Sequence, residues 1–344
     1  MSANSRIEWT DCTWNPVAGC SLVSPGCTHC YAMRTAARLE AMGQTKYVGL
    51  TRKVNGRTVW TDKINLGSAA DLTLPLRWAK PRRVFVNSMS DLFHPDVPFD
   101  FIDRVFAVIA LTPRHTYQIL TKRLERMAEY LNDSRDRLGF KTDERVNAEA
   151  CHLHRGDLVP EIKLGFKRSP VQQWPLPNVW LGCSVEDQQR ADERIPHLLR
   201  CPAPVRFLSI EPMLGAIDLK LGDSEGVPTE VEPCRERGWL LHWVICGGES
   251  GSHARPLHPA WARSIRDQCA AAGISFHFKQ WGEHIPFDHA TPDQIRGHDD
   301  VGDFLSVGQG GPAAMPMYRV GKHAAGRLLD GRTWDEFPST ALSE

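Results

Sequence analysis

The chain has no excess of charge of either sign. Lys and Arg together number 41 among 344 residues, and Asp and Glu also number 41. Proteins that coat DNA or lie on membrane surfaces are usually basic, so the net charge points to no such partner. Any contact with nucleic acid must therefore come from a local cluster of cations.

Long apolar segments are also missing. Residues 1–11 lack the apolar core of a signal peptide, and no apolar run is long enough to span a bilayer. These absences predict a cytoplasmic protein without a membrane partner, in which the ten cysteines stay mostly reduced. A disulfide framework is not expected, and clustered cysteines point to a metal instead.

Three of the cysteines are clustered near the N-terminus: Cys20, Cys27 and Cys30, in the spacing C-x6-C-x2-C. Glycine and proline between them indicate a bent loop. A strand-like run at 6–10 precedes the loop, and residues 31–42 favour a helix. The thiols are therefore expected on a strand–loop–helix unit.

This spacing leaves three interpretations open. Three thiolates can hold three irons of a [4Fe–4S] cluster and leave the fourth iron open to a small molecule, and radical chemistry with S-adenosylmethionine (SAM) is one use of such a cofactor. Alternatively, Cys12 or His29 could complete a structural zinc site, or the thiols could carry no metal. Core packing does not explain thiols this close in a loop, which favours the cluster.

Short apolar strands and helices alternate along most of the chain. Strands are expected near 84–87, 116–121, 179–184, 205–210, 240–246 and 274–279, and helices near 99–111, 122–131, 186–199 and 259–272. Such apolar strands are typical of a sheet buried on both faces, so the pattern predicts an α/β fold with a parallel sheet and helices outside it. An open doubly wound sheet and a full or partial barrel both fit.

The domain organisation follows from the breaks in this alternation. We expect one α/β domain over 1–282, with insertions at about 45–66, 132–178 and 218–238. The tail, 283–344, is expected to dock Trp334 and Phe337 on that domain.

The second insertion contains Cys151, His152 and His154. These residues could form a second metal site, and a solvated loop is the alternative.

Polar residues follow the predicted strands, where ligands bind in parallel α/β folds. They are Ser88, Ser90, Asp91, Thr121, Lys122, Ser184, Glu186, Glu211, Glu249, Ser250, Lys279 and Gln280. Strand ends border polar loops in any case, but the coincidence over six strands favours a site.

The stretch 247–251, Gly-Gly-Glu-Ser-Gly, follows an apolar strand. Its adjacent glycines could let a ligand approach the backbone, or form a plain tight turn. It is neither a dinucleotide fingerprint nor a P-loop. The candidate cofactor contacts are Ser88, Asp91, Lys122, Glu211, Gly247, Gly248 and Glu249.

A hairpin is predicted at 47–66, where two strand-like runs flank Asn55-Gly56. The candidate substrate contacts on it are Arg52, Lys53, Arg57 and Trp60. They could grip phosphate and stack a base, or belong to a solvated hairpin with one buried aromatic. A basic run with Lys80, Arg82 and Arg83 follows close by in sequence.

Several stretches together resemble the phage- and prophage-associated three-cysteine-motif proteins, which look like relatives of the radical SAM enzymes. Besides the cysteine loop, the matching stretches are 14–16, 87–93, 120–123, 247–251, 278–282 and 326–331. The resemblance implies a partial (β/α)6-type TIM barrel of the radical SAM kind, with a [4Fe–4S] cluster on the loop after the first strand. Cys20, Cys27 and Cys30 match that loop.

Two functions are therefore expected. The first is an enzyme that receives an electron from an electron donor, cleaves SAM reductively and acts on a nucleic acid or nucleotide, with a peptide as the competing substrate. The second is a non-catalytic protein, stabilised by zinc or a cluster, that binds nucleic acid or a protein partner.

Overall fold

A computed structural model describes residue 5 and residues 7–132, 139–155, 171, 173–221, 241–295 and 315–339, with only the backbone of residues 154 and 155. Its main feature is a seven-stranded sheet in the order β1-β6-β7-β8-β9-β10-β11. These strands are β1 (Cys12–Trp14), β6 (Arg83–Val86), β7 (Thr116–Thr121), β8 (Val179–Ser184), β9 (Val205–Ile210), β10 (Trp243–Gly247) and β11 (Ser275–Gln280).

The order of the strands in the sheet follows their order in the chain. The pairs β1–β6, β6–β7, β9–β10 and β10–β11 are parallel. A doubly wound sheet reverses its order at a switch point. The predicted mixed α/β fold with a parallel sheet is therefore confirmed, and the doubly wound alternative is wrong. A partial barrel would share this strand order.

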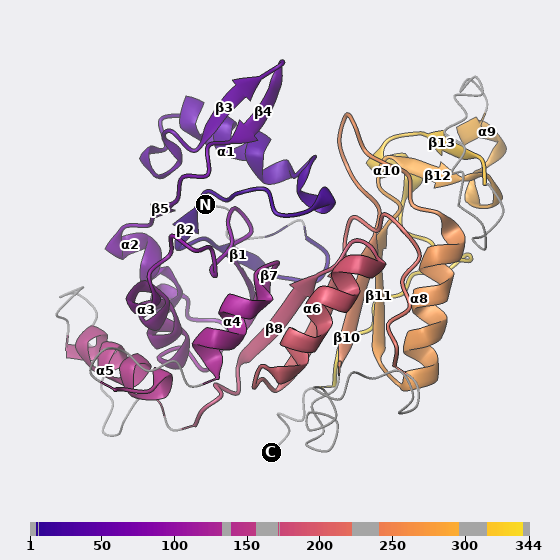
Figure 1. Cartoon of the computed structure of the whole chain (residues 1–344). Coiled ribbons are helices and arrows are strands. Elements are labelled where there is room, and N and C mark those ends of the chain that lie inside the picture. The colour runs from indigo at the N-terminus through magenta and orange to yellow at the C-terminus, as the bar shows by residue number, and fades with distance from the viewer. Residues whose placement is uncertain are drawn as a thin grey trace. The chain divides into compact units, whose positions relative to one another are not determined.

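The helices alternate with these strands, as predicted. They are α1 (Tyr31–Ala41), α2 (Ala69–Leu72), α3 (Phe99–Ala110), α4 (Leu124–Leu131), α5 (Thr142–Arg155), α6 (Gln188–Arg200), α8 (Pro259–Ala272), α9 (Pro292–Ile295) and α10 (Lys322–Ala325). Figure 1 shows α3 beside α5, and α8 beside β10 and β11. None of the helices in the described ranges is long and apolar enough to cross a membrane.

Short elements complete the chain. The two-stranded pairs are β2 (Val17–Ala18) with β5 (Asn65–Leu66), β3 (Thr51–Val54) with β4 (Arg57–Trp60), and β12 (His284–Pro286) with β13 (Met317–Arg319). The 3-10 helices are η1 (Pro25–Cys27), η2 (Thr45–Tyr47), η3 (Leu74–Arg77) and η4 (Phe287–His289). The antiparallel pair of β3 and β4 confirms the hairpin predicted around Asn55-Gly56. The insertion at 218–238 lies mostly outside the described residues.

The strand expected at 6–10 is wrong. The N–H of Thr10 donates to the carbonyl of Ile7 at 3.2 Å, so residues 7–10 form a turn, and the first strand is β1. The N–H of Asp11 donates to the carbonyl of Arg83 at 3.0 Å and sets the pairing of β1 with β6. The cysteine loop still follows the first strand of the sheet.

The chain divides into two compact units. The first unit comprises Met1–Val23, Ala32–Gly182 and Arg200–Val205, and the second comprises Ser24–Tyr31, Cys183–Leu199 and Arg206–Glu344. The predicted boundary at residue 282 falls inside the second unit. Cys20 belongs to the first unit, whereas Cys27 and Cys30 belong to the second.

Buried aromatic residues mark the core of each unit. In the first, the Trp14 ring packs edge-on against Tyr117, whose hydroxyl lies 2.6 Å from that of Thr112 after α3. In the second, the Trp243 and Phe337 ring centroids are 5.0 Å apart. Trp334 packs edge-on against Phe276. The predicted docking of the two tail aromatics is therefore confirmed.

His277 lies beneath this C-terminal segment and is only 1 % exposed. Neither ring nitrogen has a hydrogen-bond partner within the described part of the chain, and Asp335 Oδ1 is 3.8 Å from Nδ1. Burial and the charge of Arg327 lower the pKa of His277 to about 4, from an ordinary 6.5. The folded protein therefore holds this imidazole neutral.

Stability should consequently fall as the pH is lowered through the window between these two pKa values. The unfolded chain binds a proton below pH 6.5, while the folded chain resists protonation down to about pH 4. The cost approaches about 3 kcal/mol at the lower end. Urea unfolding at pH 7, 6 and 5 should show a smaller loss for His277→Gln than for the wild type. The exposed control His323→Gln should follow the wild type, and equal losses in all three proteins would contradict this assignment.

Candidate functional site

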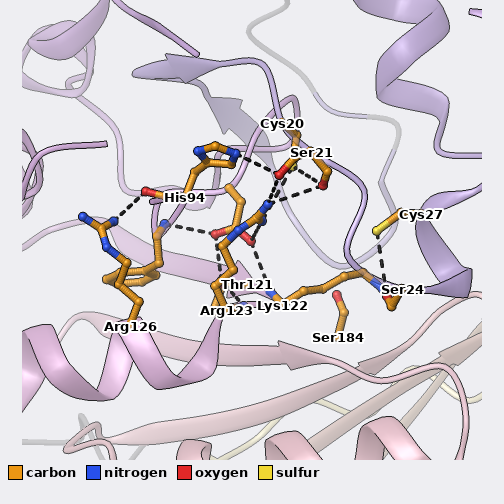
Figure 2. A network of polar contacts seen from close by, with 12 residues as sticks. Cys20, Ser21, Ser24, Cys27, His94, Thr121, Lys122, Arg123, Arg126 and Ser184 are labelled. Atoms are coloured by element: carbon orange, nitrogen blue, oxygen red, sulfur yellow. Dashed lines mark hydrogen bonds and ion pairs between the residues drawn. The ribbon is translucent and has the colours of Figure 1, made fainter. Parts of the chain in front are cut away.

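In the first unit, the guanidinium of Arg123 joins the cysteine loop to the residues that follow β6 and β7 (Figure 2). Its Nη1 lies 2.8 Å from Asp91 Oδ2 and 3.8 Å from Cys20 Sγ. Its Nη2 donates to Ser21 Oγ at 2.7 Å and to the Ser21 carbonyl at 3.4 Å. The Arg123 side chain is 10 % exposed. One buried cation therefore holds the residues at and after the first cysteine.

Asp91 is the acceptor that fixes this cation. Its carboxylate also accepts from the Thr121 hydroxyl at 2.7 Å and from the N–H groups of Lys122 at 3.2 Å and Phe93 at 3.0 Å. The structure thus brings together Asp91 and Lys122, two of the predicted cofactor contacts. It uses Asp91 to tie the ends of neighbouring strands to Arg123. Ser88 donates to Asn15 Oδ1 at 3.2 Å.

The electrostatics of this network keep Arg123 charged. Burial lowers the pKa of Arg123, but the charges of Asp91 and Cys20 outweigh it and raise that pKa above its usual value. Burial and the nearby Arg123 cation lower the pKa of His94, whose Nε2 is 2.9 Å from Ser21 Oγ. The network therefore places a permanent positive charge beside the Cys20 sulfur and an imidazole disposed to be neutral beside Ser21.

In the second unit, Glu186 and Arg255 hold the turn that carries Cys27. Glu186 is fully buried, and its Oε1 accepts from the Gly26 N–H at 3.2 Å. Its other oxygen lies 3.1 Å from Arg194. Arg255 Nη2 donates to the Pro25 carbonyl at 3.1 Å. Residues that follow β8 and β10 thus fix the backbone just before Cys27.

Glu249, one of the predicted cofactor contacts, orients Arg255. Arg255 Nη2 lies 2.6 Å from Glu249 Oε1, and Arg255 Nε lies 2.8 Å from Oε2. The Arg255 N–H adds a third bond to the same carboxylate at 2.9 Å. Both oxygens of this buried carboxylate are therefore used to aim the guanidinium at Pro25.

A further ion pair lies at the ends of β9 and β11. Lys279 Nζ is 2.8 Å from Glu211 Oε1, and Gln280 Nε2 donates to the same carboxylate at 3.3 Å. The Gly247 carbonyl accepts from the Met213 N–H at 3.1 Å. Glu211 and Gly247, two further predicted contacts, thus lie close together at this edge of the second unit.

The glycine at position 248 is required by the chain itself. A Cβ built on Gly248 would lie 1.9 Å from the Trp281 carbonyl oxygen, a backbone atom. Gly282, next in the chain after Trp281, has a φ of +87°. This close approach of the Trp281 backbone explains the glycine at position 248 without a ligand.

Gly248→Ala should therefore lower the free energy of unfolding by about 2 kcal/mol or more, because backbone must shift to admit the methyl group. Gly247→Ala is a matched control, since the nearest atoms to its added Cβ lie at an ordinary 3.4 Å. Urea unfolding of both variants compares the two positions. Equal losses would show that the Trp281 contact is not what requires the glycine.

Three residues at these sites were missed from sequence. Arg123 ends the matching stretch 120–123 and Arg255 lies four residues after the stretch 247–251, but nothing local indicates their partners. Asn87 is 2 % exposed with a φ of 60°, and neither amide atom has a hydrogen-bond partner among the residues described. An asparagine directly after an apolar strand was the available signal, since Asn tolerates this backbone region.

The β3–β4 register separates the cations of the hairpin. Arg52 lies opposite Val59 and Arg57 lies opposite Val54, so the two arginines share one face. Lys53 lies on the other face, as does Trp60. Trp60 is only 5 % exposed. The ring is therefore the buried aromatic of the alternative interpretation, and stacking of Trp60 on a base does not fit, whereas the three cations are exposed.

The basic run after the hairpin is partly engaged within the protein. Arg82 lies over the Trp78 ring at 5.5 Å, and Arg83 pairs with Asp11 at 3.0 Å. Lys80 is exposed.

The three cysteines of the loop carry thiols rather than disulfides, and each is half-buried. Cys30 directly precedes α1, whose N-terminus favours an anionic thiolate. Arg123 places a cation at Cys20. These surroundings suit thiolate ligands of a cluster. Within the described ranges, no three or more His, Cys, Asp and Glu side chains are gathered as a metal site.

The other metal ligands considered from sequence have different surroundings. Cys12 is 1 % exposed and burial raises its pKa, which disfavours the thiolate that zinc needs. The His29 ring lies 5.8 Å from that of His253. Cys151 and His152 lie on α5, and the His154 side chain is outside the described residues.

Residues 4–338 match the model of a family described as "Protein of unknown function (DUF5131)", so the chain belongs to that family. A search of curated proteins and a search of solved structures each returned no match.

Proposed function

We propose that the chain is an iron–sulfur protein of the radical SAM type, with Cys20, Cys27 and Cys30 as the ligands of a [4Fe–4S] cluster in a partial barrel. The observation that carries the proposal is the anchoring of the cysteine loop. Arg123 donates hydrogen bonds to Cys20 and Ser21 of the loop. Glu186 accepts from the Gly26 N–H, and Arg255 donates to the Pro25 carbonyl. The buried charges of Arg123 and Glu186 and the partly exposed Arg255, all fixed on a loop of three thiols, support a metal centre.

The bound cluster would supply one electron for cleavage of SAM to methionine and a 5′-deoxyadenosyl radical. The chain's own residues would bind and orient SAM. Glu211 and Lys279 offer opposite charges at the ends of β9 and β11, which suit the ammonium and carboxylate of an amino acid. Asp91 and Glu249 serve as anchors of the loop.

The test is metal analysis after anaerobic purification and reconstitution with iron and sulfide. The proposal predicts about four irons per chain. Reduction in the presence of SAM should then yield 5′-deoxyadenosine. Stoichiometric zinc without iron would contradict the cluster, and iron without 5′-deoxyadenosine would favour the non-catalytic binding protein.

We further propose a nucleic acid or nucleotide as the substrate. Exposed cations gather in and around the hairpin, and none has an ion-pair partner within the described ranges; they are Arg34, Arg38, Arg52, Lys53, Arg57 and Lys63. Glu40 of α1 accepts from the Gly49 N–H, which ties the hairpin to α1. A local concentration of cations on a neutral protein suits contacts with phosphate.

Binding to DNA or RNA should accordingly weaken steeply with salt. The triple variant Arg52→Ala, Lys53→Ala, Arg57→Ala should bind more weakly and reduce the slope of log affinity against log salt by about 2–3. A control triple variant with Lys141, Lys220 and Lys322 changed to alanine should retain the slope. Fluorescence anisotropy at low and moderate salt measures both. Binding that is absent at low salt, or indifferent to the hairpin variant, would favour a peptide substrate.

A further inference from the structure

The contact between Arg123 and Cys20 has a specific geometry. The guanidinium has two N–H groups on each Nη atom. Those on Nη1 serve Asp91 Oδ2 at 2.8 Å and Cys20 Sγ at 3.8 Å, and those on Nη2 serve the Ser21 hydroxyl and carbonyl. All four N–H groups are thus directed to fixed acceptors. Figure 2 shows the Arg123 side chain directed toward Cys20 and Ser21.

We infer that Arg123 sets the reduction potential of the metal centre through Cys20. This inference rests on the proposed function, because it requires Cys20 to be a ligand of the cluster. Hydrogen bonds to ligand sulfur and nearby charge are the protein's main means of adjusting such potentials. A cation beside the sulfur stabilises the reduced cluster, which carries one more negative charge, and so raises the potential.

Asp91 acts in the opposite direction. Its carboxylate forms an ion pair with the same Nη1 atom that lies near Cys20, and so offsets part of the guanidinium charge. The Asp91 side chain is 7 % exposed, so solvent screens the pair little. Removal of either partner should therefore change the potential, and the two changes should have opposite signs. A purely structural role for the pair would not produce opposite signs.

Arg126 provides the matched control. It lies three residues further along and donates to the carbonyls of His94 at 2.6 Å and Val97 at 2.7 Å. Its guanidinium also lies over the Phe99 ring at 4.5 Å. It is thus an arginine of the same region whose hydrogen bonds go to backbone carbonyls and not to a cysteine.

The experiment is an anaerobic spectroelectrochemical titration of the reconstituted protein and of variants with wild-type iron content. Arg123→Gln should lower the midpoint potential by at least a tenfold change in the equilibrium constant, about 59 mV for a one-electron couple. Asp91→Asn should raise it. Arg123→Lys, which keeps the charge, should shift it less than Arg123→Gln, and Arg126→Gln, which removes a charge without a hydrogen bond to cysteine, should shift it less than Arg123→Gln as well.

Arg123→Gln leaves a buried carboxylate unpaired and could lose its iron through misfolding. In that case the double variant Arg123→Gln, Asp91→Asn replaces the ion pair with a neutral pair. The midpoint potential of Asp91→Asn alone then tests the inference. An unchanged potential in Asp91→Asn, or shifts of the same sign in both single variants, overturns the inference. The iron content of the wild type reports separately on the proposed function, since a wild type without iron contradicts the cluster itself.

Discussion

Cys27→Ala should reduce the iron content of the anaerobically reconstituted protein from about four irons per chain to nearly none. Two remaining thiolates cannot hold a cluster that already lacks a fourth protein ligand. The same loss is expected for Cys20→Ala and Cys30→Ala. Iron analysis and the visible absorption of the cluster both measure it.

Cys151→Ala is the control for this series. Cys151 lies on α5 and is half-buried, as the three loop cysteines are. It should retain the full iron content. Iron that survives in Cys27→Ala, or that disappears equally in Cys151→Ala, would show that the loop cysteines are not the ligands.

Glu186→Ala should destabilise the protein by about 3–5 kcal/mol, because it leaves Arg194 buried without its partner. Arg194 is 7 % exposed and Glu186 is fully buried. The change also removes the acceptor of the Gly26 N–H and should loosen the turn before Cys27. Urea unfolding measures the first effect, and faster loss of iron to a chelator measures the second.

Glu193→Ala, next to Arg194 on α6, serves as the comparison. Its carboxylate is 51 % exposed and pairs with Arg190 at 3.5 Å, so its loss should cost no more than about 1 kcal/mol. A Glu186→Ala variant as stable as Glu193→Ala would contradict the role assigned to the buried pair.

The sequence predicts most of the fold because the signals are local. The strands of the sheet are short apolar runs, and α3 presents Phe101, Ile102 and Val105 to the core. The error at residues 7–10 has a different origin. That run and Cys12–Trp14 both suit a strand, and only pairing with Arg83–Val86, some seventy residues away, decides between them.

The site is less predictable because its partners are distant in sequence. The cysteine spacing is visible locally, but Arg123 and Asp91 are 32 positions apart and Arg255 and Pro25 are 230 apart. The sequence therefore identifies Asp91 and Glu249 as polar residues after strands. It does not show that their carboxylates pair with Arg123 and Arg255. The burial of Trp60 was likewise one of two open alternatives until the register of the hairpin was known.

The central claim is that three thiolates hold a cluster whose fourth iron is open to SAM. The most direct test is the Mössbauer spectrum of protein reconstituted with isotopically enriched iron, recorded with and without SAM. The account predicts four irons per chain, of which about one in four changes its spectrum when SAM is added. A spectrum that SAM leaves unchanged, or a protein that holds zinc and no iron, would contradict it.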